Sequence, residues 1–141
     1  MLRLRVILLT LGLATLATQY PRQAHAATLG LDLYSHHTSG RTYESNNPGV
    51  YVVLDNGFGA GVLRNSLGQT SVHVDYTMCG GSASDLVQPC VTAGAITGYQ
   101  MIDNQNVRPM VVPSLRIGFV RLSGVASRRC VGVHFSLEKQ L

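Results

Sequence analysis

Several residue types on which large functional classes depend are scarce in this chain of 141 residues. It contains no Trp, a single Lys and three Cys, and charged residues make up 13% of its length. Nucleic-acid binders need dense Lys and Arg, and coiled coils and disordered tails are rich in charge, so these classes are excluded. The sequence also lacks the HExxH and CxxC metal motifs and the glycine fingerprints of nucleotide-binding loops. We therefore expect neither a cofactor nor a metal ion.

The first 26 residues have the pattern of a secretory signal peptide. Arg3 and Arg5 give it a positive start, residues 6–18 form an apolar stretch, and Ala24-His25-Ala26 is a small-residue cleavage site. The stretch is too short to be a membrane-spanning helix, which needs about 20 residues. Cleavage after Ala26 leaves one domain, residues 27–141, in which eight Lys and Arg face seven Asp and Glu. The sequence thus predicts an exported protein with a mature net charge near +1.

Export to an oxidising compartment makes the three Cys possible disulfide partners rather than zinc ligands. Cys79 and Cys90 bracket a turn-rich segment whose ends meet if the flanking strands pair. We expect a Cys79–Cys90 disulfide, which would stabilise the fold by about 2 to 3 kcal/mol in the chain-entropy description. Three thiols allow three single pairings, and in this one Cys130 is left over.

Apolar and polar residues alternate along the mature chain, which shows no sustained helical period. In residues 71–78 the even-numbered positions are apolar, and in residues 131–138 the odd-numbered positions are apolar. Turn signals such as Asp55-Asn56-Gly57 divide the chain into short strands. The predicted strands span residues 28–36, 49–54, 57–64, 70–78, 90–99, 110–116, 117–123 and 131–138. Pro109 and Pro113 indicate a strand that is broken or that begins there.

Eight such strands predict an all-β fold, a small eight-stranded antiparallel up-and-down barrel, because closure removes the sheet edges. The polar face carries His73, Asp75, His134 and Glu138, which are costly in a dry core without partners. A polar interior inside an apolar exterior is typical of outer-membrane barrels. The apolar runs of about 7 to 8 residues are, however, shorter than the usual 9 to 11 of a spanning strand. We expect the outer-membrane type, and the alternative is a soluble periplasmic barrel or sandwich that binds a small ligand.

Alternate connections of such a barrel lie at the same end. With a periplasmic N-terminus, the connections 36–48, 64–69, 100–109 and 124–130 form an outer rim. This rim gathers His36, His37, Asn65 and Ser66 with five arginines, Arg41, Arg64, Arg108, Arg128 and Arg129. Because Arg binds phosphate in a bidentate way, the five predict contact with anionic head groups such as those of lipopolysaccharide. The alternative is an ordinary solvated rim.

Short segments spaced along most of the mature chain form a further pattern. They are a His at the end of the first predicted strand, Tyr43-Glu44-Ser45-Asn46-Asn47-Pro48-Gly49, residues 59–66, Val74-Asp75-Tyr76, residues 93–97 and residues 109–115. This pattern resembles the lipid A palmitoyltransferase family. The resemblance implies an outer-membrane barrel that moves an acyl chain from a phospholipid to lipid A, using a His and an Asp-Ser pair at the extracellular rim. In this chain the His is His36 or His37 and the Ser is Ser66.

The chain departs from that family's pattern at several points. Asn65 stands where the family has Asp, the amphipathic helix before the first strand is missing, the first outer loop is shorter, and the rim lacks Trp. The position that resembles the family's acyl-chain gauge is Thr77, and Asp75 shares its predicted inward face. The interior pocket is therefore expected to be smaller and wetter than a palmitoyl chain requires.

Acyl transfer needs a hydroxyl, a base that activates it and donors aimed at the developing oxyanion. Ser66 is the candidate nucleophile or polarising hydroxyl, and His36 or His37 is the candidate base. Arg64, Asn65 or the backbone amides of residues 65–69 are candidate oxyanion donors. The alternative is that residues 65–68 form a turn and nothing more.

A second polar group follows one face of the last predicted strand. His134, Ser136 and Glu138 lie about 6 to 7 Å apart in successive steps, too far for direct hydrogen bonds. Their order is similar to the His-x-Ser of outer-membrane lipid A deacylases, but we interpret them as polar residues of the barrel interior.

Three functions remain open. The first is a monomeric lipid A acyltransferase with outer-membrane lipids as partners. The second is a non-catalytic envelope barrel with a lipopolysaccharide-binding or structural role. The third is the soluble ligand-binding barrel.

Overall fold

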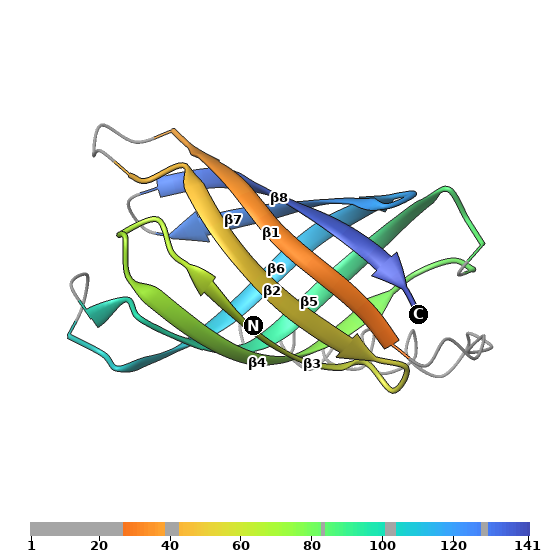
Figure 1. Cartoon of the computed structure of the whole chain (residues 1–141), viewed down its shortest axis with the longest axis horizontal. Helices are drawn as coiled ribbons and strands as arrows, with labels where there is room; N and C mark the ends of the chain where they lie inside the picture. The colour runs from red at the N-terminus through yellow and green to blue at the C-terminus, as the bar shows by residue number, and fades with distance from the viewer. Residues whose placement is uncertain (1–26, 39–42, 83, 101–103, 128–129) are drawn as a thin grey trace, which may run out of the picture.

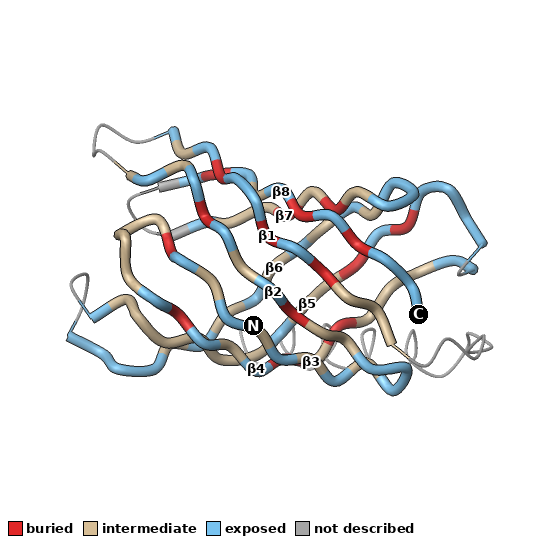
Figure 2. Tube along the Cα trace, in the orientation of Figure 1, coloured by how far each residue is buried: buried red, intermediate tan, exposed pale blue. Residues whose placement is uncertain are grey.

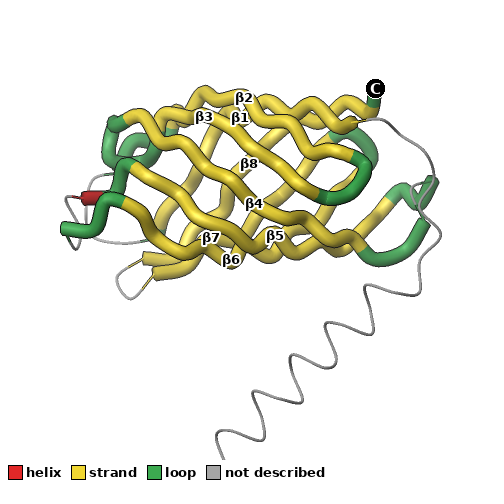
Figure 3. Tube along the Cα trace, turned by 90° about the horizontal axis from the view of Figure 1, so that it is seen from below, coloured by secondary structure: helices red, strands yellow, loops and turns green. Residues whose placement is uncertain are grey.

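The structure, a computed structural model, describes residues 27–38, 43–82, 84–100, 104–127 and 130–141. Its strands are β1 (Ala27–His37), β2 (Asn46–Leu54), β3 (Phe58–Arg64), β4 (Thr70–Cys79), β5 (Val87–Thr97), β6 (Val107–Ile117), β7 (Val120–Ser127) and β8 (Cys130–Gln140). Each strand pairs antiparallel with the next, and β1 pairs with β8, so the sheet closes (Figures 1 and 3). The predicted up-and-down barrel is confirmed. The predicted signal peptide lies outside the described residues.

In the described part of the chain, no helix is long and apolar enough to span a bilayer.

The two ends of the barrel differ in their connections. The end that joins β1 to β2, β3 to β4, β5 to β6 and β7 to β8 is called the rim, and the opposite end is called the base. At the base, a two-residue turn at Gly118 and Phe119 joins β6 to β7, with Gly118 at a φ of +58°. The predicted boundary between residues 116 and 117 was wrong, because this tight turn needs the positive φ that Gly118 supplies.

Burial alternates along the strands (Figure 2). Most of the buried side chains are polar, and many large apolar side chains are exposed on the outside of the barrel. In β4, Val72 and Val74 are 50% and 59% exposed, whereas Asp75 is buried. In β8, Val133 is exposed and Ser136 is buried. The predicted polar interior and apolar exterior are therefore confirmed.

Inward-facing glycines make room for large side chains in the lumen. A Cβ on Gly30 would lie 2.0 Å from Cζ of Tyr51, and a Cβ on Gly61 would lie 2.4 Å from Nε2 of His73. These separations are far below van der Waals contact, so a side chain at either position would displace Tyr51 or His73. The glycines of β1 and β3 thus allow both large side chains to occupy the lumen.

A β-bulge in β1 changes which of its residues face inward. The register with both β2 and β8 shifts between Asp32 and Tyr34, and two successive residues, Leu33 and Tyr34, are exposed. Beyond the bulge the alternation resumes one position later. Ser35 is therefore buried on the inward side, His36 is exposed, and His37 is half-buried on the inward side.

β6 and β7 are paired only near the base. The pairs run from Ile117↔Val120 to Ser114↔Ser123, although both strands continue toward the rim. Because Ile117 flanks a two-residue turn, the odd-numbered residues of β6 direct their backbone groups toward β7. Pro113 and Pro109 occupy two of these positions and have no N–H to donate. The ladder thus ends beside Pro113, and the unpaired stretch toward the rim is called the β6–β7 gap.

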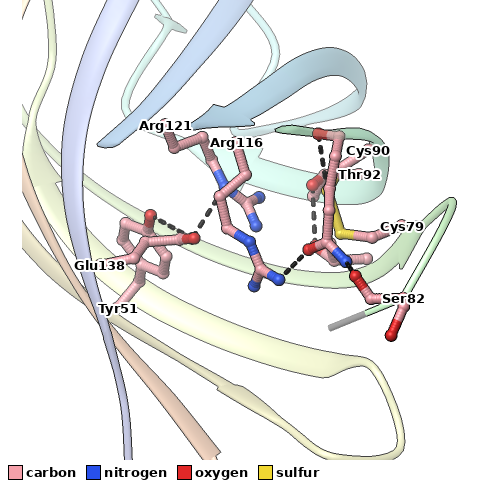
Figure 4. Close-up of a disulfide and its surroundings, with 10 residues drawn as sticks. Tyr51, Cys79, Ser82, Cys90, Thr92, Arg116, Arg121 and Glu138 are labelled. Carbon is pink, nitrogen blue, oxygen red and sulfur yellow. Dashed lines mark hydrogen bonds and ion pairs between the residues drawn. A yellow bond between two sulfur atoms is a disulfide. The ribbon is translucent and has the colours of Figure 1, made fainter. Parts of the chain in front are cut away.

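The base of the lumen holds the disulfide and a charged cluster (Figure 4). Cys79 and Cys90 are disulfide-bonded, with their sulfur atoms 2.01 Å apart, which confirms the predicted pairing. Nearby, Oε1 of Glu138 accepts a hydrogen bond of 2.8 Å from the Tyr51 hydroxyl and lies 2.7 Å from Nε of Arg121. A buried acid on β8 is thereby paired with a buried cation on β7.

Two further polar side chains continue this cluster toward the loop between β4 and β5. Arg116 donates a hydrogen bond to the side-chain oxygen of Gln88, and Gln88 donates one to the Ser82 carbonyl (Figure 4). These bonds tie the loop at the base to the barrel wall.

Candidate functional site

The predicted His and Ser meet at the rim. His37 is the last residue of β1, and Ser66 lies in the turn between β3 and β4. His37 Nε2 is 2.7 Å from Ser66 Oγ, within hydrogen-bond distance. His36, the other candidate base, is exposed on the outside because of the bulge. The structure therefore brings His37, and not His36, to Ser66.

Asn65 holds the turn that presents Ser66. Its Oδ1 accepts hydrogen bonds from the backbone N–H groups of Leu67 (2.9 Å) and Gln69 (3.0 Å). Its Nδ2 donates to Ser71 Oγ (2.9 Å) and to the Gly98 carbonyl (2.7 Å), which lies in the next connection at the rim. The side chain is buried. Asn65 thus uses both ends of its amide to fix the turn in place.

These bonds determine which of the predicted oxyanion donors remain. The amides of residues 65 and 67–69 all donate within the turn, to Asn65 or to the Gln69 carbonyl. Among the described residues, no hydrogen-bond acceptor is found for the N–H of Ser66. An oxyanion formed at an acyl group on Ser66 would lie beside this N–H, as in hydrolases that use the amide of their own nucleophile.

A cavity of about 330 Å³ extends from the His37–Ser66 pair into the lumen. Part of its lining is apolar and comes from β3, β5, β6 and β7: Leu63, Ile96, Met110, Val112 and Val125. The outward-facing residues Pro109, Val111 and Ala126 also line it, so the cavity reaches the outer surface at the β6–β7 gap. The volume lies at the small end of the range for ligand pockets.

Another part of the lining is polar. Thr77 and Asp75 both line the cavity, and Thr77 Oγ1 is 2.7 Å from Thr92 Oγ1. His73 Nδ1 is 2.5 Å from Asp75 Oδ2. The position at which the resemblance places the acyl-chain gauge is therefore part of a hydrogen-bonded, polar wall.

The second polar group found in the sequence divides between two partners. His134 Nε2 lies 2.9 Å from Asp32 Oδ1, and the Ser136 hydroxyl donates to the same oxygen at 2.9 Å. Glu138 belongs to the cluster at the base. Sequence reasoning missed Asp32 as the shared partner, although the pair Asp32↔Ser136 follows once β1 and β8 close the barrel.

The predicted head-group arginines have different surroundings. Arg64 is exposed and bonds Glu44 through Nε (2.8 Å) and Nη2 (3.1 Å), and the hydrogen bonds hold the pKa of Glu44 below its ordinary value. Arg108 lines the cavity, with its guanidinium 5.9 Å from the centre of the Tyr99 ring. The remaining three, Arg41, Arg128 and Arg129, lie outside the described residues.

His37 is partly shielded from water although it stands at the rim, beyond the apolar outer row of β1. The Tyr43 ring lies 4.8 Å from the imidazole, centre to centre. Burial lowers the pKa of His37, and the nearby His134 and His36 lower it further. The neutral imidazole that a general base needs is thus favoured at neutral pH.

Comparisons with models of known protein families and with curated proteins found no match. Within the described residues, no group of three or more His, Cys, Asp and Glu side chains is arranged to hold a metal ion.

Proposed function

We propose that this protein is a monomeric outer-membrane acyltransferase that moves a fatty acyl chain from a phospholipid to lipid A. The observation that carries the proposal is the 2.7 Å contact between His37 Nε2 and Ser66 Oγ at the rim end of a partly apolar cavity. Such a pair supplies a nucleophile and its base, and the cavity offers a place for an acyl chain.

The exterior of the barrel supports a membrane location. Large apolar side chains are exposed on most strands, among them Leu31, Val50, Val62, Val74, Val87, Val111 and Phe135. Monomeric soluble proteins rarely expose a contiguous apolar surface of this extent, because water makes it unfavourable. Hydrocarbon as the surrounding solvent removes that cost, and the buried polar lumen is then typical of an outer-membrane barrel.

The β6–β7 gap supports lipid as the substrate. A phospholipid in the surrounding bilayer can reach the cavity sideways through this gap, without leaving the membrane. Its acyl chain then contacts apolar wall residues such as Met110 and Val112. The polar wall at Thr77 and Asp75 limits the room for that chain, so we expect a chain shorter than palmitoyl.

The proposed reaction has two balanced steps. Ser66 Oγ attacks the ester carbonyl carbon of the phospholipid while its proton passes to His37 Nε2, and the glycerol oxygen leaves with that proton as lysophospholipid. A hydroxyl of lipid A then gives its proton to Nε2 and attacks the acyl-Ser66 ester, and Ser66 Oγ leaves with that proton from Nε2, which restores the Ser66 hydroxyl and the neutral imidazole. The N–H of Ser66 faces the oxyanion in both steps.

Replacing Ser66 with Ala tests this function directly. We expect cells that express the protein to contain lipid A with one added acyl mass, and Ser66→Ala to lower that product at least about 100-fold because the nucleophile is gone. Mass spectrometry of lipid A measures the product, with Ser45→Ala as the control at the same rim. An unmodified lipid A in cells that carry the folded protein would contradict the proposal.

The pH profile of the reaction gives a second test. His37 acts as a base only when neutral, so the rate falls as the pH drops through the pKa of His37 in the folded protein. Because burial, His134 and His36 all lower this pKa, the acid limb should lie below that of an exposed histidine. Initial rates with detergent-solubilised protein and phospholipid measure it. An acid limb at or above the ordinary histidine range would argue against His37 as the base.

The non-catalytic envelope barrel is the second candidate, and one observation favours it. Asn65 is fully engaged in the turn, so an amide occupies the position beside Ser66 where the resembled family has a carboxylate. This candidate predicts a heat-modifiable band in the membrane fraction together with unmodified lipid A.

A further inference from the structure

Two hydroxyl groups contact the same nitrogen of the candidate base. His37 Nε2 lies 2.7 Å from Ser66 Oγ and 2.9 Å from Ser35 Oγ. An imidazole nitrogen offers a single N–H or a single lone pair in the ring plane, so it cannot serve both hydroxyls in the same way. The direction of the Ser35 hydroxyl therefore decides how His37 and Ser66 interact.

The hydrogen of Ser35 is committed elsewhere. The Ser35 hydroxyl donates to Asn47 Oδ1, and both side chains are almost completely buried, at 2% and 1% exposure. Asn47 Nδ2 donates to the carbonyls of Arg64 (3.1 Å) and Glu44 (3.4 Å), which only accept hydrogen bonds. These two carbonyls fix the amide with its oxygen toward Ser35. Ser35 consequently presents only lone pairs to His37.

This direction has two consequences for His37. When Nε2 of His37 carries no proton, Ser35 has no hydrogen to donate to its lone pair. The Ser66 hydroxyl is then the hydrogen-bond donor to Nε2. When Nε2 carries a proton, Ser35 Oγ accepts the N–H and stabilises the protonated form. Ser35 and Asn47 thus act to raise the pKa of His37, whereas burial, His134 and His36 lower it. The Tyr43 ring contacts the same imidazole, with the ring centres 4.8 Å apart.

We propose that Ser35 and Asn47 are positioning residues that keep the lone pair of His37 Nε2 for Ser66 and then hold the proton that Nε2 receives. This inference rests on the proposed acyl transfer. In each step the proton moves from the attacking hydroxyl to Nε2 and is held by Ser35 Oγ until the leaving alcohol takes it.

Three variants separate this role from simple packing. Ser35→Ala removes the acceptor, and we expect kcat to fall about tenfold with little change in KM, because only the proton-holding state is affected. Asn47→Leu frees the Ser35 hydroxyl to donate to Nε2 and to occupy the lone pair that Ser66 needs, so kcat should fall further. In the double variant the competing hydroxyl is gone, so kcat should return to the level of Ser35→Ala. A packing defect would instead make the double variant the worst of the three.

Titration of His37 provides a readout that does not depend on activity. Long-range proton–nitrogen NMR spectra of labelled protein in micelles follow Nε2, and the His37 signal is identified by its loss in His37→Gln. We expect Ser35→Ala to lower the pKa of His37. Asn47→Asp keeps an acceptor for Ser35 and adds a negative charge, so it should raise the pKa of His37. This variant replaces Asn47→Leu as the test of Asn47 if Asn47→Leu does not fold. Asn46→Leu, at the exposed neighbouring position, is the control.

The two readouts distinguish the failures. An active wild-type protein whose kcat and His37 titration are unchanged in the Ser35 and Asn47 variants would overturn the inference and leave the acyl transfer standing. Shifts of the His37 titration in the expected directions in a protein that transfers no acyl chain would support the hydrogen-bond network and overturn the proposed function.

Discussion

Glu138→Ala should lower the free energy of unfolding by about 3 to 5 kcal/mol, the usual cost of removing one partner from a buried ion pair. Glu138 Oε1 lies 2.7 Å from Nε of Arg121 and accepts the hydrogen bond of Tyr51. Both charged side chains are buried, so the substitution leaves a guanidinium in the lumen without its acid. Arg116, which continues the same cluster, adds a second positive charge nearby.

Urea unfolding in detergent micelles, followed by the heat-modifiable gel shift, measures this loss. Glu138→Gln keeps the shape and an acceptor for Tyr51, so it should cost less than Glu138→Ala. The double variant Glu138→Leu with Arg121→Met removes both charges and should recover most of the stability. Equal stability of Glu138→Ala and the wild type would show that the Glu138–Arg121 pair does not stabilise the folded barrel.

Asn65→Asp should lower the free energy of unfolding by about 2 to 3 kcal/mol and should not raise acyl transfer, although it restores the Asp of the resembled family. Asn65 Nδ2 donates to Ser71 Oγ and to the Gly98 carbonyl. An Asp places a second carboxylate oxygen against that carbonyl, so two hydrogen bonds are lost and two acceptors face each other. The turn that presents Ser66 is then displaced from His37.

Unfolding in urea and mass spectrometry of lipid A together check this expectation. Asn46→Asp adds the same charge at an exposed position and should leave stability nearly unchanged. A gain of acyl transfer in Asn65→Asp at unchanged stability would contradict the structural role of Asn65. It would instead show that the natural Asn65 disables the enzyme by removing a catalytic acid.

The sequence was sufficient to predict the faces of the barrel. Alternation along a strand directs successive side chains to opposite sides, so His73 and Asp75 had to share a face that excludes Val72 and Val74. Because two ionisable groups are costly in a dry core, that face had to line a polar lumen. The Cys79–Cys90 disulfide followed from the same strand pairing.

The candidate site was predictable only in part. Ser66 and a His at the end of the first strand were identified from the sequence, but the sequence did not distinguish His36 from His37 as the candidate base. The bulge at Leu33 and Tyr34 turns His37 inward and His36 outward. The local sequence does not predict this bulge, since both residues are ordinary strand formers. The strand boundary at Gly118 was also missed, although the glycine that this tight turn requires is present in the sequence.

The order of strands, the separation of polar and apolar faces and the disulfide were determined by the sequence alone, because each depends on residues within one strand or one hairpin. Only the tertiary structure decided which hydroxyls meet His37, that Asn65 serves the turn, and that β6 and β7 part beside Pro113. The contacts of His37 depend on the register between strands that are far apart in the chain, whereas the roles of Asn65 and Pro113 depend on which groups the neighbouring strands and connections bring to them. A shift of one residue in that register reverses which side chains face the lumen.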